Sequence, residues 1–229
     1  MKFCSPLPIT KESKSFQKDV YKPWEDTHVG ETAVVIGNGN SLKDVSGELL
    51  EKYPTFGTNH IYVLPFQPTY YVCIDETVLM FFPNEIYPTV ARADIAFLNG
   101  NLFNYPHWAT RDLYDLPNVY RYDEHTLVLP GEIWVAGGTV TYVALKMAFG
   151  MGFSTILLAG CDRDKEWTHF SEDYPALGHR HEYFLRGQEY HFGIAGEAYK
   201  EAGRRIVNLS LPSVLDEHFE RGRAEDWLN

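Results

Sequence analysis

Two glycines and a serine follow the first strongly apolar run of the chain. The run Ala33–Ile36 consists of small and β-branched residues, which is typical of a strand buried on both faces of a parallel sheet. Gly37 and Gly39 interrupt this strand, Ser41 is a residue suited to a helix N-cap, and Leu42 opens a helical pattern. Such a turn directs free backbone N–H groups and the positive end of a helix dipole to one point. The spacing therefore predicts a site for a phosphate or another anion.

Polar side chains recur where the predicted buried strands end. They are Asn38 and Asn40 in the glycine turn, Asn59, Asp75 and Asp162. Each one alone is also typical of a cap or a tight turn, and the turn lacks the third glycine of the dinucleotide-binding pattern. The carboxyl ends of parallel strands, however, meet at one edge of a sheet, where open α/β sheets bind their ligands. The shared placement favours a nucleotide site at that edge.

The stretch after Asp162 is predicted to be a long polar and aromatic loop that extends to about Tyr190. Four histidines lie in it or directly after it: His169, His179, His181 and His191. Histidine accepts a proton near neutral pH, and tyrosine hydroxyls can stabilise a leaving phosphate. A histidine in a loop is also commonly a solvated surface group, so the residues by themselves leave both interpretations open.

The elements that must position these residues alternate between strands and helices. Strands are predicted at 33–36, 55–59, 70–74, 93–98, 154–160 and 205–209, with short ones near Val119 and Leu127. Helices are predicted at 42–52, from Gly137 through Ala148, at 196–202 and after Pro212. This alternation predicts an α/β fold: a Rossmann-like, mostly parallel, doubly wound sheet in a single domain. The expected organisation is an N-terminal arm at 1–30 and the nucleotide-binding domain at 31–229.

The composition agrees with one large globular domain and limits the classes of partner that the protein is expected to bind. The chain has 229 residues, 45% hydrophobic and 22% charged, and a net charge of −11, which disfavours a nucleic-acid partner. No apolar run is long enough to span a bilayer, and the N-terminal residues lack a signal-peptide core. Three cysteines lack metal or redox spacing, which suits a reducing compartment, so a cytoplasmic location is expected.

Several short motifs, in this order and spacing, resemble a Rossmann-like superfamily over roughly residues 32 to 215. The superfamily includes the bacterial sialyltransferases of glycosyltransferase family 42 and the 6-hydroxymethylpterin diphosphokinase-like proteins of the DUF115 type. Asn40 departs from the pattern, in which a proline is usual. The resembling segments are Gly37-Asn38-Gly39-Asn40-Ser41-Leu42, Phe56-Gly57-Thr58-Asn59, Gly138-Thr139-Val140, Ile156–Asp162 and Asn208–Ser213.

The resemblance to the sialyltransferases implies a donor that is a cytidine nucleotide sugar (a CMP-sugar) and an acceptor that is an unidentified hydroxyl compound. It implies that no cofactor or metal is required. The nucleotide-binding residues that it implies are Gly37, Asn38, Gly39, Asn40, Ser41, Asn59, Gly138, Thr139 and Asp162. By position His191 is the implied general base, with His179, His181 and His169 as rivals, and Tyr174 and Tyr183 are the implied donors to the leaving phosphate.

The resemblance to the diphosphokinases implies instead that the enzyme binds ATP and Mg²⁺. Asp75 and Asp162 would then hold the metal, because Mg²⁺ takes one or two carboxylates together with phosphate oxygens and water. No P-loop lysine is present in the sequence. A third interpretation is a non-catalytic nucleotide-binding domain, since a fold does not fix a function. A homo-oligomer is compatible with all three.

Overall fold

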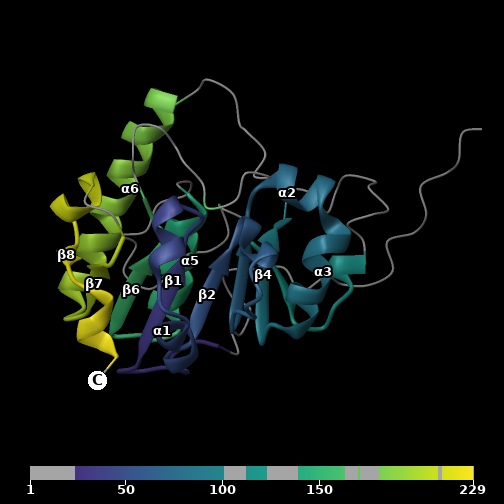
Figure 1. Ribbon diagram of the computed structural model, residues 1–229, viewed down its shortest axis with the longest axis horizontal. Helices are drawn as coiled ribbons and strands as arrows, with labels where there is room; N and C mark the ends of the chain where they lie inside the picture. The colour runs from purple at the N-terminus through teal and green to yellow at the C-terminus, as the bar shows by residue number, and fades with distance from the viewer. Residues whose placement is uncertain are drawn as a thin grey trace, which may run out of the picture.

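Eight parallel strands form one sheet in the part of the chain that the structure, a computed structural model, describes: residues 24–100, 112–122, 139–162, 170, 181–210 and 213–228. The strand order is β5-β4-β3-β2-β1-β6-β7-β8, and every neighbouring pair is parallel (Figure 1). The strands are β1 Thr32–Ile36, β2 Thr55–Thr58, β3 Tyr70–Cys73, β4 Ile95–Asn99, β5 Val119–Tyr122, β6 Thr155–Ala159, β7 Arg205–Asn208 and β8 Glu220–Arg221. The predicted α/β class with a parallel sheet is confirmed.

The direction of strand addition reverses at β1. From β1 the chain adds strands outward to β5, and it then returns to place β6 on the other side of β1. The last residue of β1, Ile36, is level with Gly57 on one side and Ala159 on the other. Because ligands of open α/β sheets bind outside the carboxyl ends of the strands at such a reversal, the ends of β1 and β6 are the expected site.

Both faces of the sheet are covered, which explains why the strands are continuous apolar runs. Side chains alternate across a strand, so Ala33 and Val35 contact one hydrophobic cluster while Val34 and Ile36 contact the other. The first cluster includes α5 and α6, and the second includes the helices between β1 and β4. The α-helices are α1 Gly47–Lys52, α2 Glu76–Phe81, α3 Pro83–Arg92, α5 Val140–Gly150 and α6 His181–Glu201.

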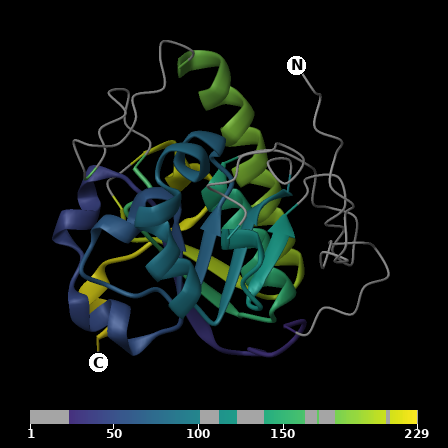
Figure 2. The ribbon, with the colours of Figure 1, turned by 90° about the vertical axis from the view of Figure 1, so that its right-hand side faces the viewer.

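Helix α6 is longer than the sequence predicts and begins earlier. Its 21 residues run down to β7, and its N-terminal part rises beyond the ends of the strands (Figures 1 and 2). The expected loop to about Tyr190 and the helix limited to 196–202 are therefore wrong. The helix interior contains Gly187, Gly193 and Gly196, which lower helix propensity, but Phe192, Ala195, Ala198 and Tyr199 bury a continuous stripe that offsets this cost.

The predicted helix at 42–52 is divided into two pieces. A 3₁₀-helix, η1, covers Asn40–Asp44, and α1 begins only at Gly47. Ser46 interrupts the helix, because its hydroxyl accepts a hydrogen bond from the amide of Glu48 at 3.2 Å and so caps the start of α1. Ser41, expected as the N-cap, lies inside η1, and Gly39 has the N-cap position.

Some shorter elements also differ from expectation. The segment after Pro212 forms a 3₁₀-helix, η4 Val214–Glu217, with Ser213 and Asp216 in a capping box. Five further elements are not predicted from the sequence: α2, α3, the short strand β8 and the 3₁₀-helices η2 (Asn59–Val63) and η5 (Ala224–Trp227). The strand expected near Val119 is present as β5, and the one near Leu127 lies outside the described residues.

Of the expected N-terminal arm, the structure describes the last part. The Trp24 side chain is buried and packs edge-on against Phe97 and Tyr120, with ring centroids 5.5 and 4.6 Å away. The arm boundary at residue 30 stays a prediction, because residues 1–23 lie outside the described part. None of the described helices combines the length and the apolar character that crossing a bilayer requires.

Candidate functional site

The turn after β1 and the turn after β6 are joined by backbone hydrogen bonds. Gly37 N–H donates to the carbonyl of Ala159 at 2.8 Å, and Gly39 N–H donates to that of Gly160 at 2.7 Å. A Cβ on Gly37 would lie 2.4 Å from the Gly160 oxygen, and a Cβ on Gly39 would lie 2.7 Å from the carboxyl carbon of Asp162. Both glycines are therefore required by the close approach of the protein's own chain.

Ser41 and Asp162 form a further contact between the same two turns. The Asp162 carboxylate accepts from the Ser41 amide at 2.7 Å through Oδ2 and from the Ser41 hydroxyl through Oδ1. The expectation that the turn presents free N–H groups is thus wrong for Gly37, Gly39 and Ser41, because the end of β6 accepts all three. Asn40 is exposed at the start of η1. The predicted nucleotide contacts of these residues and of Asp162 stay predictions.

Asn38 connects the turn after β1 to the end of β2. Its Nδ2 donates to the carbonyl oxygen and to the hydroxyl of Thr58, each at 2.9 Å, and its Oδ1 accepts from the amide of His60 at 2.9 Å. The Thr58 hydroxyl in turn donates to the Ile36 carbonyl at 2.7 Å. Asn59, which lies between Thr58 and His60, is buried at the same edge and has a positive φ of 41°. The structure therefore brings Asn38 and Asn59 together, as the sequence predicts.

The N-terminus of α5 lies at the same edge. Thr139 is its N-cap and accepts from the Tyr142 amide at 3.3 Å, while the Thr141 hydroxyl lies 3.9 Å from the sulfur of Cys161 at the end of β6. The helix runs opposite to the strands, so the positive end of its dipole points to the carboxyl edge beside β6. This position suits an anionic group bound at the reversal of strand order.

His191 reaches this region from α6 and not from a loop. Its ring contacts that of Tyr142 in the first turn of α5, with centroids 5.0 Å apart, and that of the exposed Tyr190 at 5.7 Å. Its Nδ1 lies 2.5 Å from the carbonyl oxygen of Gly187. Since a carbonyl only accepts, Nδ1 carries the proton in the neutral ring and Nε2 carries the lone pair. This tautomer is the one that a general base at Nε2 requires.

The two carboxylates proposed as metal ligands lie on strands that are not neighbours. Asp75 follows β3 and Asp162 follows β6, with β2 and β1 between them, a separation of about 14 Å between strand axes. The Asp75 side chain caps α2 by accepting from the Thr77 amide at 2.8 Å. Oxygens that share one Mg²⁺ lie within about 4 Å of each other, so this placement disfavours a site made of both carboxylates. The described residues include no group of three or more possible metal ligands.

Some predicted residues lie outside the described part of the chain: Gly138, Tyr174, His169 and His179. His181 and Tyr183 lie on the first turn of α6, but their side chains are not described. Tyr183 precedes His191 by about two helical turns, or about 12 Å along the axis. The predicted roles of Tyr174 and Tyr183 stay predictions.

The side chains that hold the strand ends together are not among the residues predicted from the sequence. The Thr58 hydroxyl donates to the Ile36 carbonyl and so joins β2 to β1, and the Tyr71 hydroxyl donates to the Asn59 carbonyl. The Ser210 hydroxyl accepts from the Cys161 amide at 2.8 Å and so joins the ends of β6 and β7. Each follows or lies within a predicted strand, so burial of a hydroxyl in an apolar run was the available signal. A buried hydroxyl requires a partner, but the sequence does not say which.

A second polar cluster lies at the ends of β3, β4 and β5. Burial lowers the pKa of Arg121 to about 10, although the nearby Tyr114 and Asp115 act in the opposite direction. Burial also raises the pKa of the Tyr114 phenol, whose hydroxyl donates to the Asn99 carbonyl at 2.5 Å. Arg121 is therefore still charged at neutral pH, and it lies over the Tyr114 ring at 5.6 Å.

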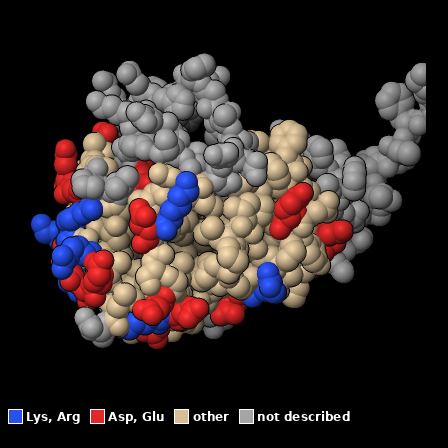
Figure 3. Space-filling model, viewed as in Figure 1, with Lys and Arg blue, Asp and Glu red and all other residues tan. Residues whose placement is uncertain are grey.

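Charges on the described surface of Figure 3 are mixed in sign. The arginines of the β7–β8 end have acidic partners at 3.6 Å: Arg205 with Glu220, Arg221 with Asp216 and Arg223 with Asp226. A nucleic-acid interface needs an uncompensated basic surface, and this part of the molecule does not provide one.

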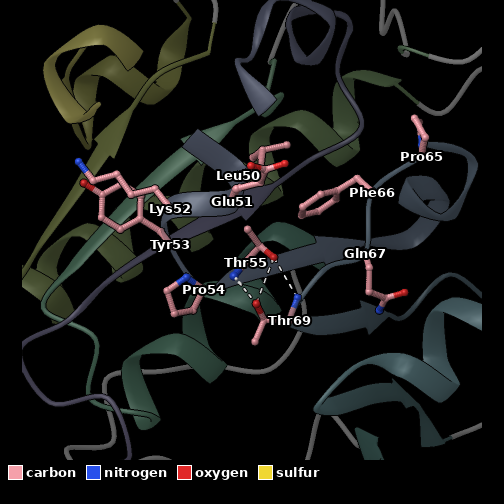
Figure 4. A pocket seen from close by; sticks show the side chains of 10 residues that line it. All are labelled: Leu50, Glu51, Lys52, Tyr53, Pro54, Thr55, Pro65, Phe66, Gln67 and Thr69. Atoms are coloured by element: carbon pink, nitrogen blue, oxygen red, sulfur yellow. Dashed lines mark hydrogen bonds between the residues drawn. The ribbon is translucent and has the colours of Figure 1, made fainter. Parts of the chain in front are cut away.

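A depression that the described residues form lies at the opposite edge of the sheet (Figure 4). Its volume is about 570 Å³, and it lies beside the starts of β2 and β3. Thr55 and Thr69 hydrogen-bond to each other across its floor. Its lining is Leu50, Glu51, Lys52, Tyr53, Pro54, Thr55, Pro65, Phe66, Gln67 and Thr69. None of the predicted site residues lines it.

No protein-family model matches the chain, and no curated protein sequence matches it. Solved structures do match the fold. The sialyltransferase CstII from Campylobacter jejuni in complex with CMP-3FNeuAc is 12% identical over 85% of this chain and 87% of that one, with a TM-score of 0.59. CstII with a trisaccharide acceptor and CMP is 15% identical, with a TM-score of 0.54 over 83% and 86%. The α-2,3-sialyltransferase Cst-I of the same organism is 18% identical, with a TM-score of 0.53 over 84% and 80%. The chain thus shares the fold of family 42 sialyltransferases over most of its length.

Proposed function

We propose that the protein is a glycosyltransferase that moves a sugar from a nucleotide donor, a CMP-sugar, to an acceptor hydroxyl. One arrangement carries the proposal: where the strand order reverses, the turns after β1 and β6 are joined, the N-terminus of α5 contacts the turn after β6, and His191 contacts the first turn of α5. The similar structures, which are complexes with CMP, with CMP-3FNeuAc and with a trisaccharide acceptor, support the same substrate classes.

The donor nucleotide would lie over the ends of β1, β2 and β6. Asn59 and Thr139 are the side chains proposed to contact it, and the dipole of α5 would stabilise its phosphate. The turn Gly37–Ser41 would shape the floor of the site, because its amides at Gly37, Gly39 and Ser41 already bond to the end of β6.

His191 is the proposed general base. Its Nε2 would take the proton of the acceptor hydroxyl as the acceptor oxygen forms a bond to the anomeric carbon of the sugar. The bond from that carbon to the phosphate oxygen breaks, and CMP leaves with the electron pair. Tyr174 and Tyr183 are proposed to donate hydrogen bonds to the leaving phosphate. This reaction consumes no cofactor. The negative charge that develops on the leaving phosphate is the group to which the tyrosine hydroxyls would donate.

The two described cysteines support the proposed location of this enzyme in the cytoplasm. Cys73 and Cys161 are buried free thiols, and burial raises the pKa of the Cys73 thiol. Buried thiols without disulfide partners are typical of a reducing compartment.

A thermal-shift screen with CMP, CDP, UDP, GDP and ATP, each with and without Mg²⁺, tests the proposal. A ligand that binds only the folded state adds about 2.7 kcal/mol of stability at one hundred times its Kd. We expect the cytidine nucleotides to raise the Tm most, with or without Mg²⁺, and EDTA to leave transfer unchanged. Stabilisation by ATP only with Mg²⁺ would favour diphosphate transfer instead, and no shift with any nucleotide would favour a non-catalytic domain.

A further inference from the structure

The turn after β2 has an unusual backbone. Asn59 directly follows β2 and has φ of 41°, in the left-handed region that non-glycine residues rarely adopt. Asp26 is the other non-glycine residue with positive φ in the described part of the chain, and it lies at an exposed turn. Asn59, in contrast, is 7% exposed and lies at the carboxyl edge of the sheet. Asparagine adopts this region more readily than most residues, but it also adopts others, so the neighbours of Asn59 decide its conformation.

Asn38 holds both residues that flank Asn59. Its amide nitrogen donates to the Thr58 carbonyl and its amide oxygen accepts from the His60 N–H, each at 2.9 Å. Both hydrogens of this amide are engaged, because the second one bonds to the Thr58 hydroxyl. Asn38 therefore bonds to the backbone immediately before and after Asn59.

Tyr71 holds Asn59 itself from the other side. Its hydroxyl donates to the Asn59 carbonyl at 2.5 Å, and its ring is completely buried within β3. The peptide groups around Asn59 are thus fixed from the turn after β1 and from β3, the two strands that flank β2. Both supporting side chains are buried, and close packing leaves buried side chains little freedom to follow a shifted backbone.

We infer that Asn38 and Tyr71 are positioning residues, which hold Asn59 in its left-handed conformation and so present its side-chain amide to the nucleotide. This inference rests on the proposed function. It changes the role expected for Asn38, from a direct nucleotide contact to a support for one, and it adds Tyr71, whose position inside an apolar strand gave no sign of a role.

The test uses Tyr71→Phe, which removes the hydroxyl and retains the ring. Tyr199→Phe is the matched control, because its hydroxyl is also buried and also donates to a backbone carbonyl, that of Leu145 at 3.0 Å, away from Asn59. Hydrogen exchange at residues 58–60 is measured without ligand, and CMP affinity is measured by calorimetry. Both measurements are repeated for Asn59→Ala and for the double variant Tyr71→Phe/Asn59→Ala.

For Tyr71→Phe we expect exchange at residues 58–60 to be about tenfold faster and CMP binding to be about three- to tenfold weaker. Tyr199→Phe is expected to change neither quantity. In the Asn59→Ala background the Tyr71→Phe change should have no further effect on CMP affinity, since the amide that it positions is gone. If the role of Tyr71 is merely structural, Tyr71→Phe should instead weaken CMP binding equally in both backgrounds.

Three results would overturn parts of the inference separately. Unchanged exchange at residues 58–60 removes the positioning of Asn59, whether or not a nucleotide binds. Faster exchange with unchanged CMP affinity removes the link to the nucleotide and leaves the proposed function intact. Failure of the unsubstituted protein to bind CMP overturns the proposed function, and with it the nucleotide part of the inference.

Discussion

The two edges of the sheet both carry polar side chains, but they use them differently. At the carboxyl edge, Asn38 and Ser41 bond to groups on neighbouring strands and so join turns that are distant in sequence. At the amino edge a polar side chain also joins distant segments, but it lies nearer to solvent: the His28 and Glu31 side chains are 20% and 54% exposed. His28 Nε2 bonds to the Tyr70 hydroxyl at 2.6 Å, and its Nδ1 bonds to Glu31 at 2.9 Å.

The two edges also differ in the features that the described residues form there. The depression of about 570 Å³ lies at the amino edge, whereas the candidate base, the dipole of α5 and the left-handed Asn59 lie at the carboxyl edge. At the carboxyl edge the strand order reverses at β1, and open α/β sheets bind their ligands at such a reversal. The buried polar groups, and not the depression, are therefore the basis on which the candidate site is assigned to the carboxyl edge.

The largest expected effect separates the two edges by catalysis. His191→Ala should reduce turnover by about 10²–10⁴-fold with little change in donor affinity, because the variant lacks the proton acceptor. His28→Ala makes the same change at the amino edge and should leave turnover unchanged. Steady-state kinetics with a CMP-sugar measure both variants. Normal turnover by His191→Ala would remove His191 from the reaction.

The next effect separates the edges by nucleotide binding. Asn59→Ala should weaken CMP binding by about 1–3 kcal/mol, the loss of a buried hydrogen bond to the ligand. Gln67→Ala, in the lining of the amino-edge depression, is the control and should retain full affinity. Calorimetric titration gives both values. The opposite pattern, with Gln67→Ala weakened and Asn59→Ala normal, would place the nucleotide at the amino edge.

A third effect concerns the junction of the turns after β1 and β6. Gly37→Ala should destabilise the fold by about 1–3 kcal/mol, because its Cβ would lie 2.4 Å from the backbone oxygen of Gly160. Gly47→Ala is the control: nothing lies within 4 Å of its Cβ, and it should be neutral or slightly stabilising in the first turn of α1. Urea unfolding measures both. Equal stability of the two variants would mean that the two turns can move apart to admit the Cβ without loss of stability.

The smallest effect is a pH dependence at the amino edge. Burial, followed by the charges of Asp94 and Glu31, raises the pKa of Tyr70 to about 12 from an ordinary value near 10. The folded state thus retains the Tyr70 proton to a higher pH than the unfolded state does. The contribution of this proton to stability is complete below pH 10 and is lost as the pH rises to about 12.

Tyr70→Phe lacks this contribution. The free energy of unfolding in urea should therefore fall less steeply for Tyr70→Phe than for the unsubstituted protein between pH 9 and pH 11.5. Parallel curves would show that Tyr70 titrates alike in both states. Because other buried phenols, such as Tyr199, also have raised pKa values, only the difference between the two proteins is informative.

Sequence alone determined the parallel α/β class and the positions of the central strands. The runs Ala33–Ile36 and Thr155–Ala159 contain one polar residue between them, Thr155, because both faces of these strands are buried. Such runs are recognisable without a structure. It also indicated the strand ends that carry Asn38, Asn59 and Asp162, because polar residues directly after buried strands must lie at one edge of a parallel sheet.

Only the tertiary structure decided which groups these residues bond to. The Gly37 and Gly39 amides were expected to be free, yet the end of β6, more than one hundred positions later, accepts them. His191 was expected in a loop, yet burial of Phe192 and Ala195 in the core extends α6 around it. Local propensity acts over a few residues, whereas hydrogen-bond partners and helix length here depend on contacts between segments that only the folded sheet brings together.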